Sequence, residues 1–418
     1  REHHSGKSMS EKKPFGLFEV TGIELEYMLV DRETLKVSPT VDLLFKDVTG
    51  AICSDVERGD VDWSNELVAH VVELKTALPT RDIASFRQKF ASEIRAMDKI
   101  LAKRGLMLLP TAAHPLFDPF TETVIWPHDN NDIYALYNHI FDCRGHGWSN
   151  LQSVHLNLPF ANDVEFAKLH TAIRLLLPLI PALSASSPIL DGKSTGLLDA
   201  RMEAYLHHQQ RLPQLMGSLI PEAVLSEEEY YREVFGPIGK ALAPFDPDGI
   251  MDHEFANSRG AIARFDRNAI EIRVVDIQEC PSADLAIAEL IVETLKALVD
   301  GRWVSNYLQR AWDQNDLLAI FKQVIKDAGA TAITSKEFLL MFNMESEQTT
   351  ANEVWKHIFK EVRSGMSANA QGCITHILEH GCLAQRILAK TGPTPDKERI
   401  ITVYKELALC LREDRQLA

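Results

Sequence analysis

The chain has 418 residues, of which 45% are hydrophobic and 25% charged, and its formal net charge is −15 with a pI of about 5.5. This composition is typical of a globular protein with a large core. The acidic balance argues against nucleic-acid and membrane-surface partners, because both attract basic patches. The most apolar stretch, Leu175–Leu183, contains two prolines and is too short to cross a bilayer. We therefore expect neither a nucleic-acid nor a membrane partner.

Six cysteines are scattered along the chain, at Cys53, Cys143, Cys280, Cys373, Cys382 and Cys410. This scatter suits reduced thiols better than a disulfide framework. We therefore expect a cytoplasmic protein. Residues 1–14 are polar and show no periodicity. We interpret them as a flexible N-terminal arm or a cloning remnant.

From Phe15 onwards, short strand-like runs alternate with helices. The predicted strands are Gly22–Val30, His70–Thr76, Leu106–Pro110, Ser153–Leu158 and Ala269–Asp276. Apolar residues at helical spacing predict helices over Arg81–Arg104 and Asp163–Leu177. The segment Pro213–Asp252 mixes glycine, proline and acidic residues, so we expect a long surface excursion of the kind that forms lids.

The character of the chain changes after Ser282. Asp284–Asp300 is strongly helical, and from Trp303 to the end the sequence is almost entirely helix-forming. We therefore predict a catalytic domain over residues 15–302 and a helical extension over residues 303–418.

Glu24 and Glu26 lie two residues apart in the first predicted strand, so both carboxylates face the same side. For one strand alone, the ordinary explanation is a half-solvated antiparallel sheet. Three further strands alternate in the same way, and their polar faces carry Glu73, His155, Asn157, Glu271 and Arg273. Four strands that offer mostly Glu and His, with little lysine, favour a shared site.

Carboxylates gathered on one face need cations. Mg²⁺ and Mn²⁺ bind carboxylate oxygens, and Mn²⁺ also accepts an imidazole. An arginine beside them would hold an anion such as a phosphate or a substrate carboxylate. This combination suggests phosphoryl transfer from a metal-bound nucleotide. The P-loop is absent, because Ser187 stands where the motif ending in "DGKST" requires its first glycine.

A second cluster lies in "CITHILEHGC". On a helix, Cys373, His376 and His380 would share a face, with Cys382 close behind, and could bind zinc. The alternative is a helix surface that carries two histidines by chance. The spacing matches no common zinc module, and both interpretations stay open here.

Six segments, taken in order, resemble the glutamate–cysteine ligase family, including its bacterial carboxylate–amine ligase branch within the glutamine synthetase-like superfamily. They are "GIELEYMLVD", "NELVAHVVELKT", "LLPTAAHP", "SVHLNLPF", "ALSASSPILDGKSTGLLDARMEAY" and "IARFDRNAIEIRVVDIQ". The resemblance runs from Phe15 to about Val299 and leaves the helical tail uncovered. It implies an α+β fold, a curved and mainly antiparallel sheet with helices on its convex side. The concave face would bind ATP and two or three Mg²⁺ or Mn²⁺ ions.

The resemblance also implies a reaction. ATP phosphorylates a glutamate-like carboxylate, and an amine then displaces phosphate to give an amide, ADP and phosphate. Carried over by position, Glu24, His155 and Glu271 would bind the metal beside the β- and γ-phosphates. The metal near the acyl phosphate would be bound by Glu26, Glu66 and Glu73. The anionic groups would be contacted by Arg273 at the transferred phosphoryl group, Arg201 at the substrate carboxylate or phosphate, and Arg264 and Asn157 on the cofactor side.

The chain departs from the family pattern at two places. His155-Leu156-Asn157 replaces the H-x-H of the carboxylate–amine ligase branch and is more like true glutamate–cysteine ligases. Asp132–Gly147 stands where an Arg-Tyr pair is expected, which leaves the amine-side pocket undefined. Two alternatives remain: a guanidino-type phosphotransferase, which would release a stable phospho-product, and a non-catalytic metal- or metabolite-binding relative that acts through its helical tail. Whichever function holds, we expect small-molecule carboxylate and amine ligands or substrates, and a homodimer formed through helices.

Overall fold

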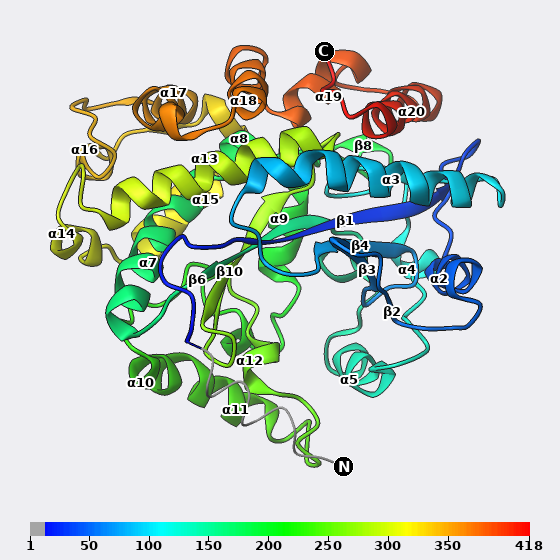
Figure 1. The fold of residues 1–418 in the computed structure, drawn as a ribbon, viewed down its shortest axis with the longest axis horizontal. Helices are drawn as coiled ribbons and strands as arrows, with labels where there is room; N and C mark the ends of the chain where they lie inside the picture. Colours follow the sequence, from blue (N-terminus) through cyan, green and yellow to red (C-terminus); the bar gives the residue numbers. More distant parts are fainter. Residues whose placement is uncertain (1–12) are drawn as a thin grey trace.

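The structure, a computed structural model, describes residues 13–418 (Figure 1), so the predicted arm over residues 1–14 falls almost wholly outside the described residues. Its centre is an eight-stranded sheet in the order β2-β3-β4-β1-β6-β10-β9, with β5 also paired to β1. All of the pairings are antiparallel. The strands are β1 (Gly22–Asp31), β2 (Asp55–Val56), β3 (Val61–Asn65), β4 (Val71–Thr76), β5 (Leu106–Leu109), β6 (Ser153–Pro159), β9 (Ala261–Arg264) and β10 (Ala269–Asp276).

The long strand β1 organises this sheet. One of its edges pairs with β4. Along the other edge, residues 22–25 pair with β6 and residues 28–31 pair with β5. The two partners therefore diverge beside Glu26, where the backbone of β1 has no strand neighbour on that side. This fork leaves room for the Glu26 side chain to interact with the first residue of β6.

Helices cover the apolar face of the sheet. Ile23, Leu25, Tyr27 and Leu29 of β1 are fully buried in the main hydrophobic cluster. The helices that supply the facing side chains are α3 (Phe86–Ala102), α7 (Asp163–Leu176) and α13 (Pro281–Val299). Pro281 sits in the first turn of α13, where a missing N–H removes no helical hydrogen bond. Figure 1 shows α3 and α13 lying along one side of the sheet, with α5, α11 and α12 on the other.

The other helices and strands that precede α13 are shorter. They are α2 (Val41–Thr49), α4 (Pro119–Glu122), α5 (Asn131–Phe141), α6 (His146–Ser149), α8 (Pro181–Ser184), β7 (Ile189–Leu190), β8 (Lys193–Ser194), α9 (Ala200–His207), α10 (Glu227–Tyr230), α11 (Gly236–Leu242) and α12 (His253–Ala256). Two of these helices, α10 and α11, lie within the predicted surface excursion, which is therefore more regular than its composition indicates.

The C-terminal segment forms an outer layer of helices. Its elements are α14 (Asn306–Arg310), α15 (Gln314–Asp327), β11 (Ala332–Ile333), α16 (Lys336–Leu340), β12 (Thr349–Thr350), α17 (Ala351–Val362), α18 (Ala368–His380), α19 (Leu383–Thr391) and α20 (Lys397–Glu413). Figure 1 shows α17 and α18 stacked over α13. Trp355 of α17 is fully buried, and its indole Nε1 donates to Leu179 O at 2.7 Å. Buried residues from both predicted domains thus belong to one hydrophobic cluster, and the division at residue 302 stays a prediction.

The predicted strands agree closely with the observed ones, and the fold class is confirmed as α+β with an antiparallel sheet. The helix predicted from Arg81 begins at Phe86, because Ile83–Ser85 forms a 3₁₀ turn first. The prediction missed three strands of the central sheet, β2, β3 and β9, and also the two-residue strands β7, β8, β11 and β12. Each of these strands spans at most five residues. Among the described residues, no helix combines the length and apolarity needed to cross a membrane.

Candidate active site

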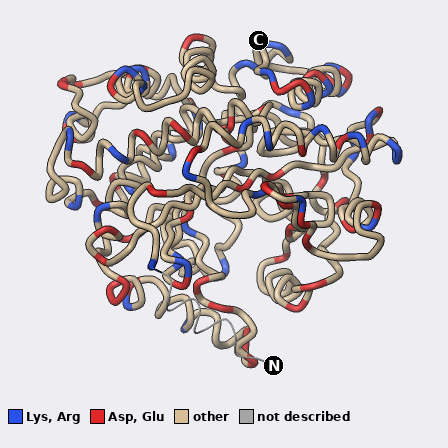
Figure 2. Tube along the Cα trace, in the orientation of Figure 1, with Lys and Arg blue, Asp and Glu red and all other residues tan. Residues whose placement is uncertain are grey.

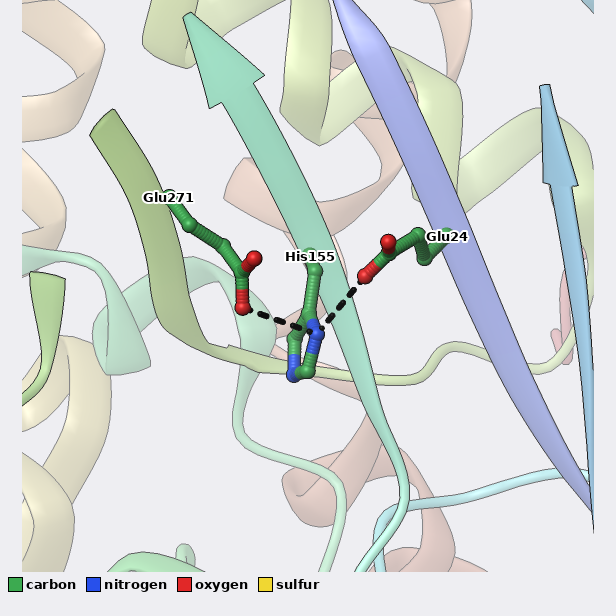
Figure 3. A group of neighbouring side chains, drawn as sticks. All are labelled: Glu24, His155 and Glu271. Atoms are coloured by element: carbon green, nitrogen blue, oxygen red, sulfur yellow. Dashed lines mark hydrogen bonds and ion pairs between the residues drawn. The ribbon is translucent and has the colours of Figure 1, made fainter. Parts of the chain in front are cut away.

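Three neighbouring strands bring together the first group of metal-ligating side chains. Glu24 on β1 lies opposite His155 on β6, and Glu271 comes from β10 on the other side of β6. The imidazole Nδ1 of His155 lies 2.9 Å from Glu24 Oε2 and 3.3 Å from Glu271 Oε1. Figure 3 shows the three side chains converging from the three strands. One ligand atom from each could reach a common ion, because these atoms lie within 4.8 Å of one another.

The second group is purely acidic. Glu26 on β1 lies directly opposite Glu73 on β4, and Glu66 comes from the connection that precedes β4. Ligand atoms of the three carboxylates also lie within 4.8 Å of one another. Like charges directly opposite each other destabilise a sheet, so this arrangement calls for a cation. Figure 2 shows acidic positions on these central strands as well as on the outer helices.

A serine joins the two groups. The backbone N–H and the hydroxyl of Ser153, the first residue of β6, donate to Glu26 Oε1 at 2.8 and 2.7 Å. The same hydroxyl lies 2.8 Å from His155 Nε2. The fork between β5 and β6 makes this contact possible, and Ser153 fixes one oxygen of Glu26.

The pKa values of these groups record the crowding of negative charge. Burial and the charge of Glu26 raise the pKa of Glu66 to about 7. Burial and the charge of Glu24 raise the pKa of Glu73 well above its usual range. Burial alone would lower the pKa of His155, but its hydrogen bond to Glu24 and the charges of Glu271 and Glu26 raise it to about 9. Without a metal, protons therefore supply part of the missing positive charge.

Arginines line the side of the site formed by β10 and β9. Arg273 Nε lies 3.3 Å from Glu271 Oε1, and Arg264 Nε lies 3.5 Å from Glu271 Oε2. Burial would raise the pKa of Glu271, but the charges of His155 and these two arginines lower it. Glu271 is consequently a carboxylate held between cations. The side chain of Arg273 stays 26% exposed and can reach a further anion.

The site opens into a cavity of about 310 Å³. The six predicted metal ligands line it, together with Arg201, Arg264, Arg267 and Arg273. Its other wall is aromatic and comprises Tyr134, Tyr137, Trp148, Tyr205, His208 and Phe255. The cavity thus combines an acidic floor, a basic side and an apolar wall. That arrangement can hold metal ions, a polyphosphate and an organic substrate together.

Not every predicted residue reaches the cavity as expected. Asn157 is not among the described residues that line the cavity. Its side chain packs over Gly22 instead, where its Cβ lies 3.2 Å from the place that a Cβ on Gly22 would occupy. Arg201 lines the cavity, but its Nε is engaged by Asp276 at 2.9 Å. The family resemblance assigns Arg201 to a substrate anion, but it gives no sign of this acidic partner.

The cysteine–histidine cluster does not assemble. Among residues 13–418, only the two groups described above bring three or more potential ligand side chains within reach of one ion. His376 Nε2 instead contacts Leu417 O at 2.8 Å, and Cys373 is buried in the hydrophobic cluster. The geometry agrees with the alternative of a helix surface that carries two histidines. All six cysteines are free thiols.

Sequence reasoning missed the aromatic wall and Ser153. Tyr134 and Tyr137 belong to α5, which lies within the segment that departs from the family pattern. Tyrosines three apart on one helix share a face, and this spacing could have signalled a wall. Ser153 could have been found because it lies two residues before His155 in the same predicted strand, and residues two apart in a strand share a face.

Comparison with known proteins identifies the fold and the family. A glutamate–cysteine ligase from Francisella tularensis, solved in complex with AMP, superposes with a TM-score of 0.61 at 11% identity, covering 95% of this chain and 90% of that one. A bifunctional glutathione synthetase from Pasteurella multocida gives a TM-score of 0.51 at 13% identity, covering 95% of this chain and 53% of that one. At such low identity these likenesses show the fold alone, which is of the glutamine synthetase-like type.

The sequence matches are closer. An uncharacterized protein of Archaeoglobus fulgidus is 30% identical over 393 residues, 94% of this chain and 98% of its own length. A protein of Bradyrhizobium sp. (strain ORS 278) named "Putative glutamate--cysteine ligase 2" is 28% identical over 275 residues, 64% of this chain and 58% of its own length. The model of glutamate–cysteine ligase family 2 matches residues 20–406. This match extends through the helical segment, so our expectation that the resemblance stops near Val299 was wrong.

Fold and sequence together define a ligase that forms carbon–nitrogen bonds. The chain belongs to glutamate–cysteine ligase family 2 and is an ATP-dependent carboxylate–amine ligase related to glutamate–cysteine ligase.

Proposed function

We propose that the protein activates the side-chain carboxylate of glutamate, or of a closely similar acid, as an acyl phosphate and transfers the acyl group to an amine. The observation that carries this proposal is the pair of ligand groups in one cavity, Glu24, His155 and Glu271 beside Glu26, Glu66 and Glu73. Two adjacent groups on one sheet face suit a reaction in which a nucleotide phosphate and a carboxylate must approach each other despite their like charges.

The residues present fit divalent cations. The donors are five carboxylates and one imidazole, the set that Mg²⁺ and Mn²⁺ accept. The raised pKa values of Glu66 and Glu73 report a shortage of positive charge at the second group. We propose one ion at each group, Mg²⁺ or Mn²⁺. When bound, such ions would neutralise charge on the phosphates and on the reacting carboxylate.

The side chains around these groups have separable tasks. We propose that Arg273 donates to the phosphoryl group during its transfer, because it is the more exposed of the two arginines next to Glu271. Arg264, on the other side of Glu271, would hold an oxygen of the nucleotide phosphates. The aromatic wall would exclude water from an acyl phosphate, which water would otherwise hydrolyse.

The proposed chemistry has two steps. A carboxylate oxygen attacks the γ-phosphorus of ATP, ADP leaves, and an acyl phosphate forms. The neutral amine then attacks the acyl carbon, phosphate leaves with the bonding electron pair, and the proton lost from nitrogen passes to solvent or buffer. The first step is needed because the oxygen of a free carboxylate is a poor leaving group, whereas phosphate is a good one.

A screen of ADP release tests the proposal. Purified protein, Mg²⁺ and ATP are combined with pairs of acids and amines, beginning with glutamate and cysteine. We expect ADP and phosphate to form in equal amounts with an amide, and only when both substrates are present. ADP together with a stable phosphorylated product would instead indicate a phosphotransferase.

A further inference from the structure

The strand that carries Glu271 and Arg273 is irregular just beyond them. Ile272 pairs with Leu156 of β6, but Val275 pairs with Val154, so three residue steps on β10 match two on β6. This is a β-bulge, which inserts one residue and re-aims the side chains that follow. Without it, Asp276 would face the same side as Ile272, the hydrophobic core. With it, Asp276 pairs with Ser153, which lies on the same face as His155.

The bulge brings Asp276 to Arg201. Asp276 is fully buried, and its Oδ1 accepts a hydrogen bond from Arg201 Nε at 2.9 Å. Arg201 Nη1 donates to the backbone oxygen of Arg273, within the bulge, at 3.2 Å. The guanidinium is therefore held at two points of β10, one within the bulge and one at Asp276 beyond it. Arg201 itself is only 2% exposed.

The carboxylate of Asp276 is held in turn. Its Oδ2 accepts from the backbone N–H of Ser186 at 2.9 Å and from the hydroxyl of Ser187 at 3.2 Å. Asp199, at the start of α9, accepts from the same hydroxyl at 3.4 Å. Burial and the charge of Asp276 raise the pKa of Asp199 well above its usual range. Arg201 is the cation that lies beside these acids.

One donor of this assembly has no partner. Arg201 Nη2 is buried and makes no hydrogen bond to the residues that the structure describes, yet Arg201 lines the cavity. A buried guanidinium nitrogen without an acceptor is costly. An acceptor supplied by a ligand would remove that cost.

We propose that Asp276 is a positioning residue, which holds Arg201 by Nε so that Nη2 donates to an anionic oxygen of a substrate bound in the cavity. This inference rests on the proposed function and deepens it. The oxygen could belong to the acid substrate or to ATP, and the experiment separates the two.

The test compares Asp276→Asn, Arg201→Met and the double variant, measuring kcat and the KM for each substrate separately. Asp276→Asn keeps the size of the side chain but removes its charge. We expect it to raise the KM for one anionic substrate roughly tenfold, the effect of one hydrogen bond to a charged group, with a smaller change in kcat. A raised KM for the acid, or alternatively for ATP, identifies the bound oxygen.

Non-additivity distinguishes positioning from a general structural effect. If Asp276 acts through Arg201, the double variant will show the same KM as Arg201→Met alone. Multiplied effects, or an unchanged KM in Asp276→Asn, would overturn the proposal. Should Asp276→Asn fail to fold, Ser187→Ala decides in its place, because it removes one hydrogen bond to Asp276 without removing a charge. We expect Ser187→Ala to raise the KM of the same substrate as Arg201→Met does, but by a smaller factor. Unchanged KM values in Ser187→Ala would overturn the proposal.

A matched control lies three residues further along. Glu279 forms a buried ion pair with Arg386 at 2.6 Å, and neither residue lines the cavity. We expect Glu279→Gln to lower the unfolding temperature without changing either KM. A KM change in this variant equal to that in Asp276→Asn would count against a positioning role.

If the wild type releases no ADP with any substrate pair, the proposed function has failed. Calorimetry of MgATP and glutamate binding then decides, and equal affinities in wild type and Asp276→Asn would overturn the positioning role.

Discussion

His155 Nδ1 lies 2.9 Å from Oε2 of Glu24, the residue directly opposite it in the sheet. With a pKa of about 9, this imidazole is protonated at neutral pH when no metal is bound. A cationic histidine between Glu24 and Glu271 thus balances charge where we propose a metal ion.

The metal-free protein should therefore lose stability as the pH rises above neutral. The pKa of His155 is about 9 in the folded protein and ordinarily about 6.5, so its contribution is complete below pH 6.5 and is lost as the pH rises through 9. Glu66 acts in the same direction, with its contribution lost as the pH rises through about 7. Urea unfolding in the presence of a chelator, from pH 6.5 to 9.5, measures the decline. We expect His155→Asn to show a shallower decline above pH 8, and an equal slope would contradict this account.

Glu26→Gln should abolish most of the activity while leaving the fold intact. The amide keeps the shape of the side chain but removes one carboxylate from the group with Glu66 and Glu73. We expect kcat to fall roughly 100-fold or more, because metal sites lose function when a charged ligand is replaced. Glu57→Gln is the matched control, since Glu57 is exposed and outside the cavity. Similar kcat values for the two variants would refute the assignment.

Gly260→Ala should disturb the bulge of β10. A Cβ at this position would lie 2.9 Å from Val274 Cγ1, and the backbone oxygen of Gly260 accepts from the N–H of Arg273 at 2.9 Å. We expect a loss of about 1–3 kcal/mol in the free energy of unfolding, from overpacking, together with reduced activity. In Gly239→Ala, within α11, the new Cβ meets nothing within 4 Å. That control should stabilise the protein by about 0.5–1 kcal/mol. Equal stabilities of the two variants would contradict the packing seen around the bulge.

Trp355→Ala tests whether the helical segment folds with the sheet. The indole is fully buried and bonded to Leu179 O, so we expect a loss of about 3–5 kcal/mol. Calorimetry should show a single unfolding transition in both proteins, at a lower temperature in the variant than in the wild type. Tyr307→Ala, at a side chain that is 79% exposed, should change stability by less than about 0.5 kcal/mol. Two separate transitions would instead support independent domains.

Much of the site could be read from local periodicity. Alternation within a strand placed Glu24 and Glu26 on one face, and the family resemblance grouped them with His155, Glu271, Glu66 and Glu73. The structure brings both groups together. Asp276 could not be assigned in this way, because counting by two assumes a regular strand and the bulge at Arg273–Val274 reverses the faces beyond it.

Contacts between distant segments were also beyond sequence reasoning. The helical pattern after Trp303 predicted helices, but hydrophobic spacing does not say what a helix packs against. Trp355 reaches Leu179 across 176 positions of the chain. The aromatic wall depends in the same way on α5 and α12 meeting at Tyr137 and Phe255, whose ring centres lie 6.1 Å apart.

Transfer of an isotopic label tests the central claim most directly. Glutamate labelled with ¹⁸O in its side-chain carboxylate is turned over with MgATP and an amine that supports ADP release, and the phosphate is analysed by mass spectrometry. The acyl phosphate route predicts one ¹⁸O atom in each phosphate formed, because the attacking carboxylate oxygen leaves with phosphorus. Amide formation with unlabelled phosphate would contradict the account.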